Sequence, residues 1–141
     1  MKFIMITGLA GSGKTTHAEK LAAVTALPLI KPGTLARERW KDKKWGLYLA
    51  PEQEMRKMVM REIDKHQGDI ILDGFPRNIS QYEWLQRVYP YTSIQIIDIK
   101  PGFFTALGRF ITRDRKNDTF LKFFTDAYRY YSLKFFIWIS K

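Results

Sequence analysis

A short apolar run near the start of the chain stops at a glycine-rich loop. The run occupies residues 3–6, and the loop at residues 8–15 has the spacing G-x-x-x-x-G-K-T. Glycines let the backbone curl so that several N–H groups point at one phosphate, and the positive end of the helix that follows points at the same place. The stretch therefore predicts a strand, a phosphate-binding loop and a helix, in that order.

Two side chains of this loop carry chemistry. Lys14 would reach the β- and γ-phosphates of a nucleoside triphosphate as a point charge, and the hydroxyl of Thr15 would bind a magnesium ion that bridges the same phosphates. A glycine-rich turn without a ligand is the alternative interpretation. The predicted triphosphate-binding residues are Gly8, Gly11, Ser12, Gly13, Lys14, Thr15 and Thr16.

The composition limits the class of protein. A chain of 141 residues, 45% of them hydrophobic, suits one globular domain, which we place at residues 1–141. It contains no cysteine, so disulfides and thiolate metal sites are excluded. The N-terminal apolar run is too short to span a membrane and leads into the loop instead of a cleavage site, so we expect a cytoplasmic protein without a membrane partner. The net charge of +10 suits a nucleotide-phosphate cleft as well as a nucleic-acid surface.

Strands and helices are expected to alternate along the chain. Apolar runs predict further strands at residues 27–30, 69–73 and 93–99, and helical signals begin near residues 31, 51, 80, 101 and 119. Such alternation implies right-handed crossovers and a parallel sheet. The expected fold class is α/β: a three-layer P-loop NTPase fold with a parallel sheet flanked by helices on both faces.

Specific expectations apply to the helix near residue 80 and to the last helix. The helix that begins near residue 80 is predicted to be capped by Ser80 and to bury Tyr82, Leu85 and either Val88 or Tyr89. In the last helix, the residues at helical spacing are assigned mostly to the core, namely Phe120, Phe124, Ala127, Tyr128 and Tyr131. Residues 133–139 are apolar on both faces, so they fit an extension of that helix or a final strand.

Charged residues at two further places suit phosphate chemistry. Asp73 ends a predicted parallel strand, where ligands of open sheets bind, and a carboxylate there orders the magnesium shell of a phosphate-loop enzyme. The predicted metal residues are therefore Thr15 and Asp73, and a cap of the next turn is the alternative role of Asp73. Arg109 and Arg113 lie one turn apart, where two arginines can grip one polyphosphate. The polar stretch that follows suits a short lid at residues 113–119.

The letters DGFPR at residues 73–77, followed by Gln81, resemble adenylate kinase and its nucleoside monophosphate kinase relatives. In that family the arginine binds the phosphate of the acceptor nucleotide and the glutamine hydrogen-bonds its adenine, which implies those roles for Arg77 and Gln81. Arg37 falls where another phosphate-binding arginine of the family stands, although Thr34 replaces the family's aspartate. The resemblance also implies an acceptor-binding segment at about residues 31–66. The implied acceptor-binding residues are Gly33, Thr34, Arg37, Gly74, Phe75, Arg77 and Gln81.

On the donor side, the resemblance covers the predicted lid. Arg109 and Arg113 match a family pair, and residues 115–118 are similar to the R-x-D-D motif of the family's lid. The implied catalytic residues are Lys14, Arg77, Arg109, Arg113 and Arg115. A second lid arginine is missing from its expected place, and Lys122 or Arg129 could replace it. The sequence also stops before the family's usual last strand and helix, which often help to cradle the donor adenine.

The resemblance implies a phosphotransferase that moves the γ-phosphoryl group of ATP, with Mg²⁺ as cofactor, to a nucleoside monophosphate, most simply AMP or dAMP. Its partners would be ATP and that acceptor, and we expect a monomer. The alternatives are a P-loop kinase that acts on nucleic-acid ends or another small molecule, and a basic nucleotide-gated binding protein. Nucleic acid is not the favoured partner, because the aromatic residues stand at core spacing.

Overall fold

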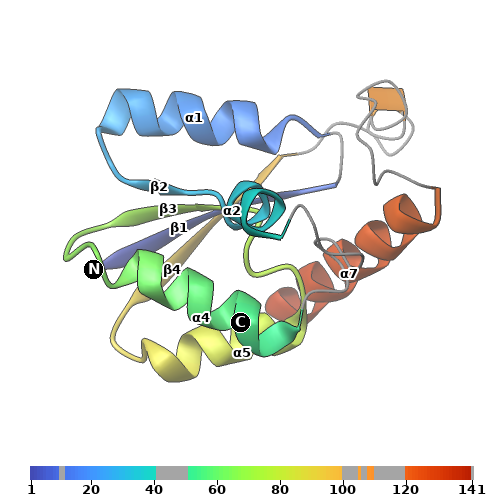
Figure 1. The fold of residues 1–141 in the computed structure, drawn as a ribbon. Helices are drawn as coiled ribbons and strands as arrows, with labels where there is room; N and C mark the ends of the chain where they lie inside the picture. Colours follow the sequence, from blue (N-terminus) through green and yellow to red (C-terminus); the bar gives the residue numbers. More distant parts are fainter. Residues whose placement is uncertain (10–11, 41–50, 100–104, 106–107, 110–119, 141) are drawn as a thin grey trace.

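A computed structural model of the chain describes residues 1–9, 12–40, 51–99, 105, 108–109 and 120–140. Within them, the strands form one sheet in the order β2-β3-β1-β4, and each neighbouring pair is parallel (Figure 1). The strands are β1 (Lys2–Gly8), β2 (Leu29–Ile30), β3 (Ile70–Asp73) and β4 (Ser93–Ile99). The helices are α1 (Lys14–Thr25), α2 (Pro32–Arg39), α4 (Glu52–Ile63), α5 (Ile79–Val88) and α7 (Phe120–Ile139). All four predicted strands are confirmed; β2, β3 and β4 lie within their predicted residues, whereas β1 extends beyond the predicted residues 3–6 at both ends.

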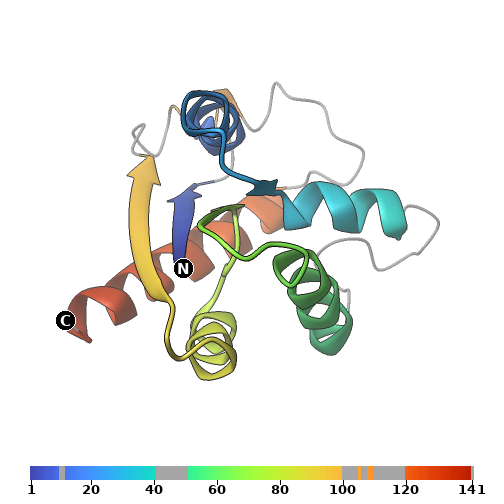
Figure 2. The same ribbon diagram turned by 90° about the vertical axis from the view of Figure 1, so that its left-hand side faces the viewer.

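Helices cover both faces of the sheet, because successive side chains of each strand point to opposite faces. Ile6 of β1 packs with Ala18 of α1 in one core. Phe3 packs on the other face with residues of α2, α4 and α5, and Met5 packs there with residues of α5 and α7. Figures 1 and 2 show this division, with α1 on one side of the sheet and α4 and α5 on the other. The predicted three-layer α/β fold is confirmed.

The buried side chains of α4 and α5 recur at helical spacing. In α4 the buried side chains are Met55, Met58, Val59 and Ile63. In α5, Tyr82 and Leu85 are buried, and Tyr89 just beyond the helix packs edge-on against Phe3, whereas Val88 is exposed. Each such aliphatic or aromatic side chain contributes about 1.5–3 kcal/mol when fully buried, so these helices are held mainly by their apolar faces.

The N-terminus of α5 differs from the prediction. Asn78, not Ser80, is the N-cap, and its side-chain oxygen accepts a hydrogen bond from the backbone N–H of Gln81 at 2.9 Å. The hydroxyl oxygen of Ser80 accepts instead a hydrogen bond from Arg56 at 2.7 Å. Asparagine caps a helix as well as serine does. Ser80 is engaged by Arg56 instead, so the predicted cap at Ser80 is wrong.

The last helix, α7, is continuous, so residues 133–139 extend it and do not form a strand. Among its described side chains, Phe123, Ala127, Leu133 and Ile137 are buried. The prediction that its aromatic residues belong mostly to the core is wrong, because Phe124, Tyr128 and Tyr131 are exposed by 52%, 75% and 48%. When aromatic residues stand on more than one face of a helix, periodicity does not reveal which face packs on the sheet.

Several expectations lie outside the described residues. These are the lid at residues 113–119, residues 41–50 of the acceptor-binding segment, and most of the helix expected from residue 101. Of that helix, Thr105, Gly108 and Arg109 are described and are helical. In the part of the chain that is described, no helix is both long enough and apolar enough to cross a bilayer.

Candidate active site

The carboxyl ends of β1 and β3 meet at one edge of the sheet, because the two strands are parallel and paired in register. Ile6 lies opposite Asp73, and the N–H of Gly74 donates a hydrogen bond to the carbonyl oxygen of Ile6 at 3.1 Å. The loop after β1 and the turn after β3 therefore begin side by side. This edge is where open parallel sheets bind their ligands.

The phosphate loop has tight backbone geometry at both of its described ends. Gly13 adopts a left-handed conformation with φ of 81° directly before Lys14, the first residue of α1. A Cβ atom at Gly8 would lie 2.5 Å from Oγ of Ser12 and 3.0 Å from the carbonyl oxygen of Ile99. Only glycine fits both positions without strain or displacement. The positive end of α1 thereby opens directly at the loop.

Thr15 and Asp73 come together beside this loop. The Thr15 hydroxyl donates a hydrogen bond to Oδ2 of Asp73 at 2.7 Å. Asp73 is only 7% exposed, and among the described residues its Oδ1 and the Oγ of Ser12 are buried atoms without a hydrogen-bond partner. Burying a polar atom without a partner is costly. A ligand atom or a water molecule beside these two oxygen atoms would complete their hydrogen bonding.

The oxygen atoms of Thr15 and Asp73 fit a magnesium ion. Mg²⁺ takes oxygen ligands and is usually bound through one or two protein groups together with substrate phosphates and water. The described residues include no cluster of three or more His, Cys, Asp or Glu side chains that could bind a metal alone. A magnesium ion at this place would therefore depend on phosphate oxygens for part of its coordination.

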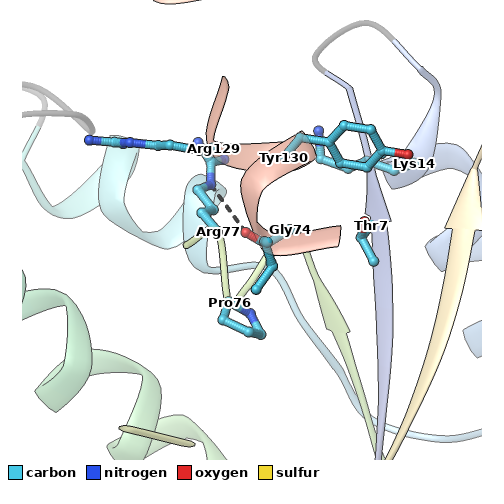
Figure 3. Close-up of a pocket in the computed structure, with 9 residues that line it drawn as sticks. Thr7, Lys14, Gly74, Pro76, Arg77, Arg129 and Tyr130 are labelled. Atoms are coloured by element: carbon cyan, nitrogen blue, oxygen red, sulfur yellow. Dashed lines mark hydrogen bonds between the residues drawn. The ribbon is translucent and has the colours of Figure 1, made fainter. Parts of the chain in front are cut away.

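A small pocket beside the loop is lined by cationic side chains from separate elements (Figure 3). Lys14 comes from α1, Arg77 from the turn after β3, and Arg129 from α7. Cations around one pocket repel one another, so a ligand with several negative charges would relieve that repulsion. The remaining lining residues are Thr7, Gly8, Gly74, Pro76, Tyr130 and Leu133.

Arg77 is fixed at the pocket by the turn that carries it. Its Nε donates a hydrogen bond to the carbonyl oxygen of Gly74 at 3.1 Å (Figure 3), and its backbone N–H donates to Oε1 of Gln81 at 2.7 Å. The Nε2 of Gln81 donates in turn to Oε2 of Glu52 at 3.3 Å. Gln81 is 5% exposed, so its amide lies inside the protein and joins the turn after β3 to the start of α4.

Asp98 near the end of β4 holds the middle of α7 beside the same pocket. The Tyr130 hydroxyl donates a hydrogen bond to Oδ1 of Asp98, and Nζ of Lys134 lies 3.0 Å from Oδ2. Burial, followed by the hydrogen bond to this carboxylate, raises the pKa of Tyr130 well above its usual value. The tyrosine therefore remains a hydrogen-bond donor, and the neighbouring Arg129 is kept at the pocket.

Of the other predicted donor-side residues, one lies beside the loop, one is exposed on α1 and three lie outside the described residues. The guanidinium group of Arg109 lies beside the loop, because a Cβ built on Gly13 would be 3.8 Å from its Nη1. Thr16 is exposed on α1. The remaining predicted donor-side residues, Gly11, Arg113 and Arg115, lie outside the described residues.

The predicted acceptor residues do not all gather at this pocket. Gly33, Thr34 and Arg37 lie together on α2, where Arg37 donates a hydrogen bond to the Thr34 hydroxyl at 3.1 Å, and none of the three lines the pocket beside the loop. Phe75 is buried in the core edge-on to Trp84. The Phe75 side chain therefore supports the turn from beneath and is not part of the pocket surface.

Sequence reasoning missed a second cavity, of about 300 Å³, that adjoins the first. Arg129 lines both cavities, and the second is otherwise lined by Glu52, Asn78, Ile79, Ser80, Tyr128 and Ser132. It forms where the N-terminal ends of α4 and α5 meet α7. No local sequence pattern predicts such a cavity, because its lining residues come from segments far apart in the chain.

Comparison of the sequence with family models and with known proteins gives matches that include most residues of this site. The sequence matches the family model described as an AAA domain over residues 7–120. The chain belongs to this family. The matched residues include the loop glycines, Asp73 and Arg77, so the family membership and the P-loop fold rest on the same part of the chain.

Among curated relatives of this AAA-domain chain, several are named adenylate kinase. It is 27% identical to adenylate kinase 1 of a Nostoc species, in an alignment that covers 84% of this chain and 73% of the relative. It is 34% identical to an adenylate kinase of Caldicellulosiruptor saccharolyticus and 37% identical to one of Lachnospira eligens, over 60% and 62% of this chain but 45% and 46% of those relatives. The resemblance to adenylate kinases is thus confirmed, and this chain spans about half to three-quarters of the length of these relatives.

The crowding around Gly8 generates a prediction. Gly8→Ala should lower the free energy of unfolding by about 1–3 kcal/mol, because the added methyl group would displace Ser12 or the end of β4. It should also weaken nucleotide binding, since Ser12 lies in the loop. Gly68→Ala is the matched control, because a Cβ at Gly68 would meet no atom within 4 Å. Urea unfolding and titration with ATP measure both effects, and equal behaviour of the two variants would contradict the geometry.

Proposed function

We propose that this chain transfers the γ-phosphoryl group of ATP to a nucleoside monophosphate, with AMP or dAMP as the preferred acceptor. The observation that carries the proposal is the convergence of Lys14, Arg77 and Arg129 on one pocket, beside the Thr15–Asp73 pair. The names of the adenylate kinase relatives support the same activity. Because those relatives are longer than the aligned segments, the activity is assigned to this chain on the strength of its own site.

Phosphoryl transfer requires alignment of the two oxygens and neutralisation of charge, and it needs no covalent intermediate. Lys14 and the positive end of α1 would hold the donor phosphates. Arg77, fixed by Gly74 and Gln81, would hold the acceptor phosphate. Arg129 lines the pocket between α7 and the turn after β3, and we assign to it the role of the missing lid arginine.

Magnesium is the proposed cofactor, held by the Thr15 hydroxyl and, directly or through water, by Asp73. When bound, it would neutralise charge on the donor phosphates. The hydrogen bond between the two side chains pre-orients their oxygen atoms. The buried Oδ1 of Asp73 supplies a further acceptor for a metal-bound water.

Gln81 is the proposed reader of the acceptor base. An amide can pair with both N6 and N7 of adenine, whereas guanine presents two acceptors there. Oε1 and Nε2 of Gln81 are engaged with Arg77 and Glu52, so binding of the base would use their second hydrogen-bonding positions or replace the contact with Glu52. Glu52 thereby becomes the residue that sets the orientation of the amide.

Removal of the loop lysine tests the function. Lys14→Ala should lower kcat/KM for transfer from ATP to AMP by about a hundredfold or more, because a charge directed at the phosphates is lost. Lys20→Ala, also on α1 but exposed away from the pocket, should retain the parent rate. A coupled assay with single nucleoside monophosphates measures transfer, and a 5′-hydroxyl oligonucleotide serves as a competing acceptor. Transfer to the oligonucleotide alone, or full activity of Lys14→Ala, would refute the proposal.

The magnesium proposal has its own test. Thr15→Val removes one oxygen ligand and the hydrogen bond to Asp73, so the Mg²⁺ concentration for half-maximal activity should rise by about tenfold or more. Thr15→Ser keeps the hydroxyl and should stay close to the parent protein. A magnesium titration at fixed total ATP makes the comparison. If all three proteins titrate alike, Thr15 is not a magnesium ligand.

Acceptor choice separates the roles of Gln81 and Arg77. Arg77→Ala should lower kcat/KM by a similar factor for AMP, CMP, UMP, GMP and TMP, because it removes a phosphate contact. Gln81→Ala should lower kcat/KM most for adenine acceptors, by about tenfold to hundredfold, since a mismatched buried polar group costs roughly 1–3 kcal/mol. Measurement of kcat/KM for the five acceptors decides this, with circular dichroism to check that each variant is folded. An equal loss for every base in Gln81→Ala would place base recognition elsewhere.

A further inference from the structure

One face of α7 exposes a continuous stripe of aromatic side chains. Its members are Phe124, Tyr128, Tyr131, Phe135 and Trp138, which are exposed by 52%, 75%, 48%, 60% and 71%. On the opposite face the same helix packs against the sheet and α5 (Figure 2). Aromatic residues are common in cores and at protein interfaces, and a clustered exposed set of this size is unusual on a monomer.

The spacing of the aromatic stripe fits contact with another helix. Its residues follow one another at intervals of four, three, four and three along the chain. These are the intervals of the a and d positions of a heptad, which gather into one seam on a helix. Scattered exposed aromatics would not share such a seam, and the stripe continues over most of the length of α7.

The aromatic stripe itself carries no charge. In the described part of α7, the cation Lys134 is half-exposed but paired with Asp98, and Arg129 lines the pocket beside the loop. A helix that binds an anionic lipid surface instead presents Lys and Arg beside its apolar face. The charge pattern therefore favours an uncharged protein surface as the occupant, and a second copy of the same stripe is one.

The area of the aromatic stripe is sufficient for self-association. Phe, Tyr and Trp each carry roughly 150–250 Å² of surface, so five of them that are about half to three-quarters exposed present on the order of 600 Å². Two copies face to face would bury about 1,200 Å², the lower end of the range for specific dimers. A contact between identical patches forms a closed two-fold pair.

We propose that this chain forms a homodimer through the aromatic stripe of α7, with the two helices antiparallel and Tyr131 nearest the two-fold axis. The antiparallel order places the Phe124 end of one stripe on the Trp138 end of the other. Tyr131 lies midway between these two residues in the sequence, so it would meet its own copy at the axis. The dimer replaces the monomer expected from the sequence. It does not depend on the activity proposed above.

The dimer should respond to salt in a characteristic way. The net charge of +10 on each chain repels a second copy, and salt screens that repulsion. Added sodium chloride should therefore strengthen dimerisation. Binding to a polyanion or an anionic vesicle would weaken under the same conditions, so the salt dependence separates the proposed partner from those two.

Analytical ultracentrifugation of the full chain over a concentration series tests the proposal. Phe135→Lys, which puts a charge in the seam, should raise the dimer dissociation constant by at least about tenfold. Tyr91→Lys is the matched control, because Tyr91 is a lone aromatic that is 99% exposed and lies outside α7, and it should leave the constant unchanged. Both positions are exposed, so the variants should remain folded, which circular dichroism verifies.

The orientation can be tested because the chain contains no cysteine. With a short bis-maleimide reagent, Tyr131→Cys should cross-link to itself. Phe124→Cys and Trp138→Cys should cross-link to each other in a mixture and poorly alone. A parent protein that stays monomeric, an equal dissociation constant for Phe135→Lys, or efficient self-linking of Phe124→Cys would each overturn the proposal. Monomeric protein that binds phosphatidylserine vesicles would assign the stripe to a lipid surface instead.

Discussion

The in-register pairing of β1 with β3 is the constraint on which the site depends. It sets Ile6 opposite Asp73 and starts the loop after β1 and the turn after β3 from the same edge. The hydrogen bond between Thr15 and Asp73 is possible only because of that register, since the two residues come from different crossover units. A shift by one residue would turn Asp73 to the opposite face of the sheet and remove it from the loop.

In the proposed function, the side-chain amide of Gln81 has two roles in the turn after β3. The Gln81 side chain holds the Arg77 backbone and connects it to Glu52. An amide oxygen has two lone pairs and an amide nitrogen has two hydrogens, so Gln81 retains one acceptor and one donor position after these contacts. Holding the Arg77 backbone and the proposed recognition of a base are therefore chemically compatible tasks. The requirement is that the base approaches an amide that is almost fully buried.

The helix α7 links the pocket beside the loop to the outer surface of the molecule. Its inner face packs on β1, β4 and α5, and Asp98 anchors it through Tyr130 and Lys134. That anchoring brings Arg129 to the pocket, while the aromatic stripe stays outside. Because Tyr128 belongs to the stripe and also lines the cavity next to Arg129, the outer surface and the site share a wall.

The sequence by itself determined the elements with strong local signals. The glycine loop, the strand that ends in Asp73 and the strand Ser93–Ile99 were predictable, because an apolar run bounded by turn residues has few alternatives. The inward face of α4 is predictable from the sequence for a different reason: its buried apolar residues recur at helical spacing and its other face is polar. The presence of Lys14, Thr15 and Asp73 at one edge followed from the parallel topology, which strand and helix alternation implies.

Tertiary structure alone decided the matters in which local preferences were balanced. Both Asn78 and Ser80 can cap α5, and the contact of Ser80 with Arg56 separates them. Large apolar and aromatic residues of α7 stand on more than one face of the helix, so tertiary packing and the contact with Asp98 decide that Phe123 and Leu133 are buried and the aromatic stripe is exposed. The position of Arg129 at the pocket also depends on which face of α7 packs on the sheet. Contacts between segments far apart in the chain determine that face, and no local sequence pattern predicts it.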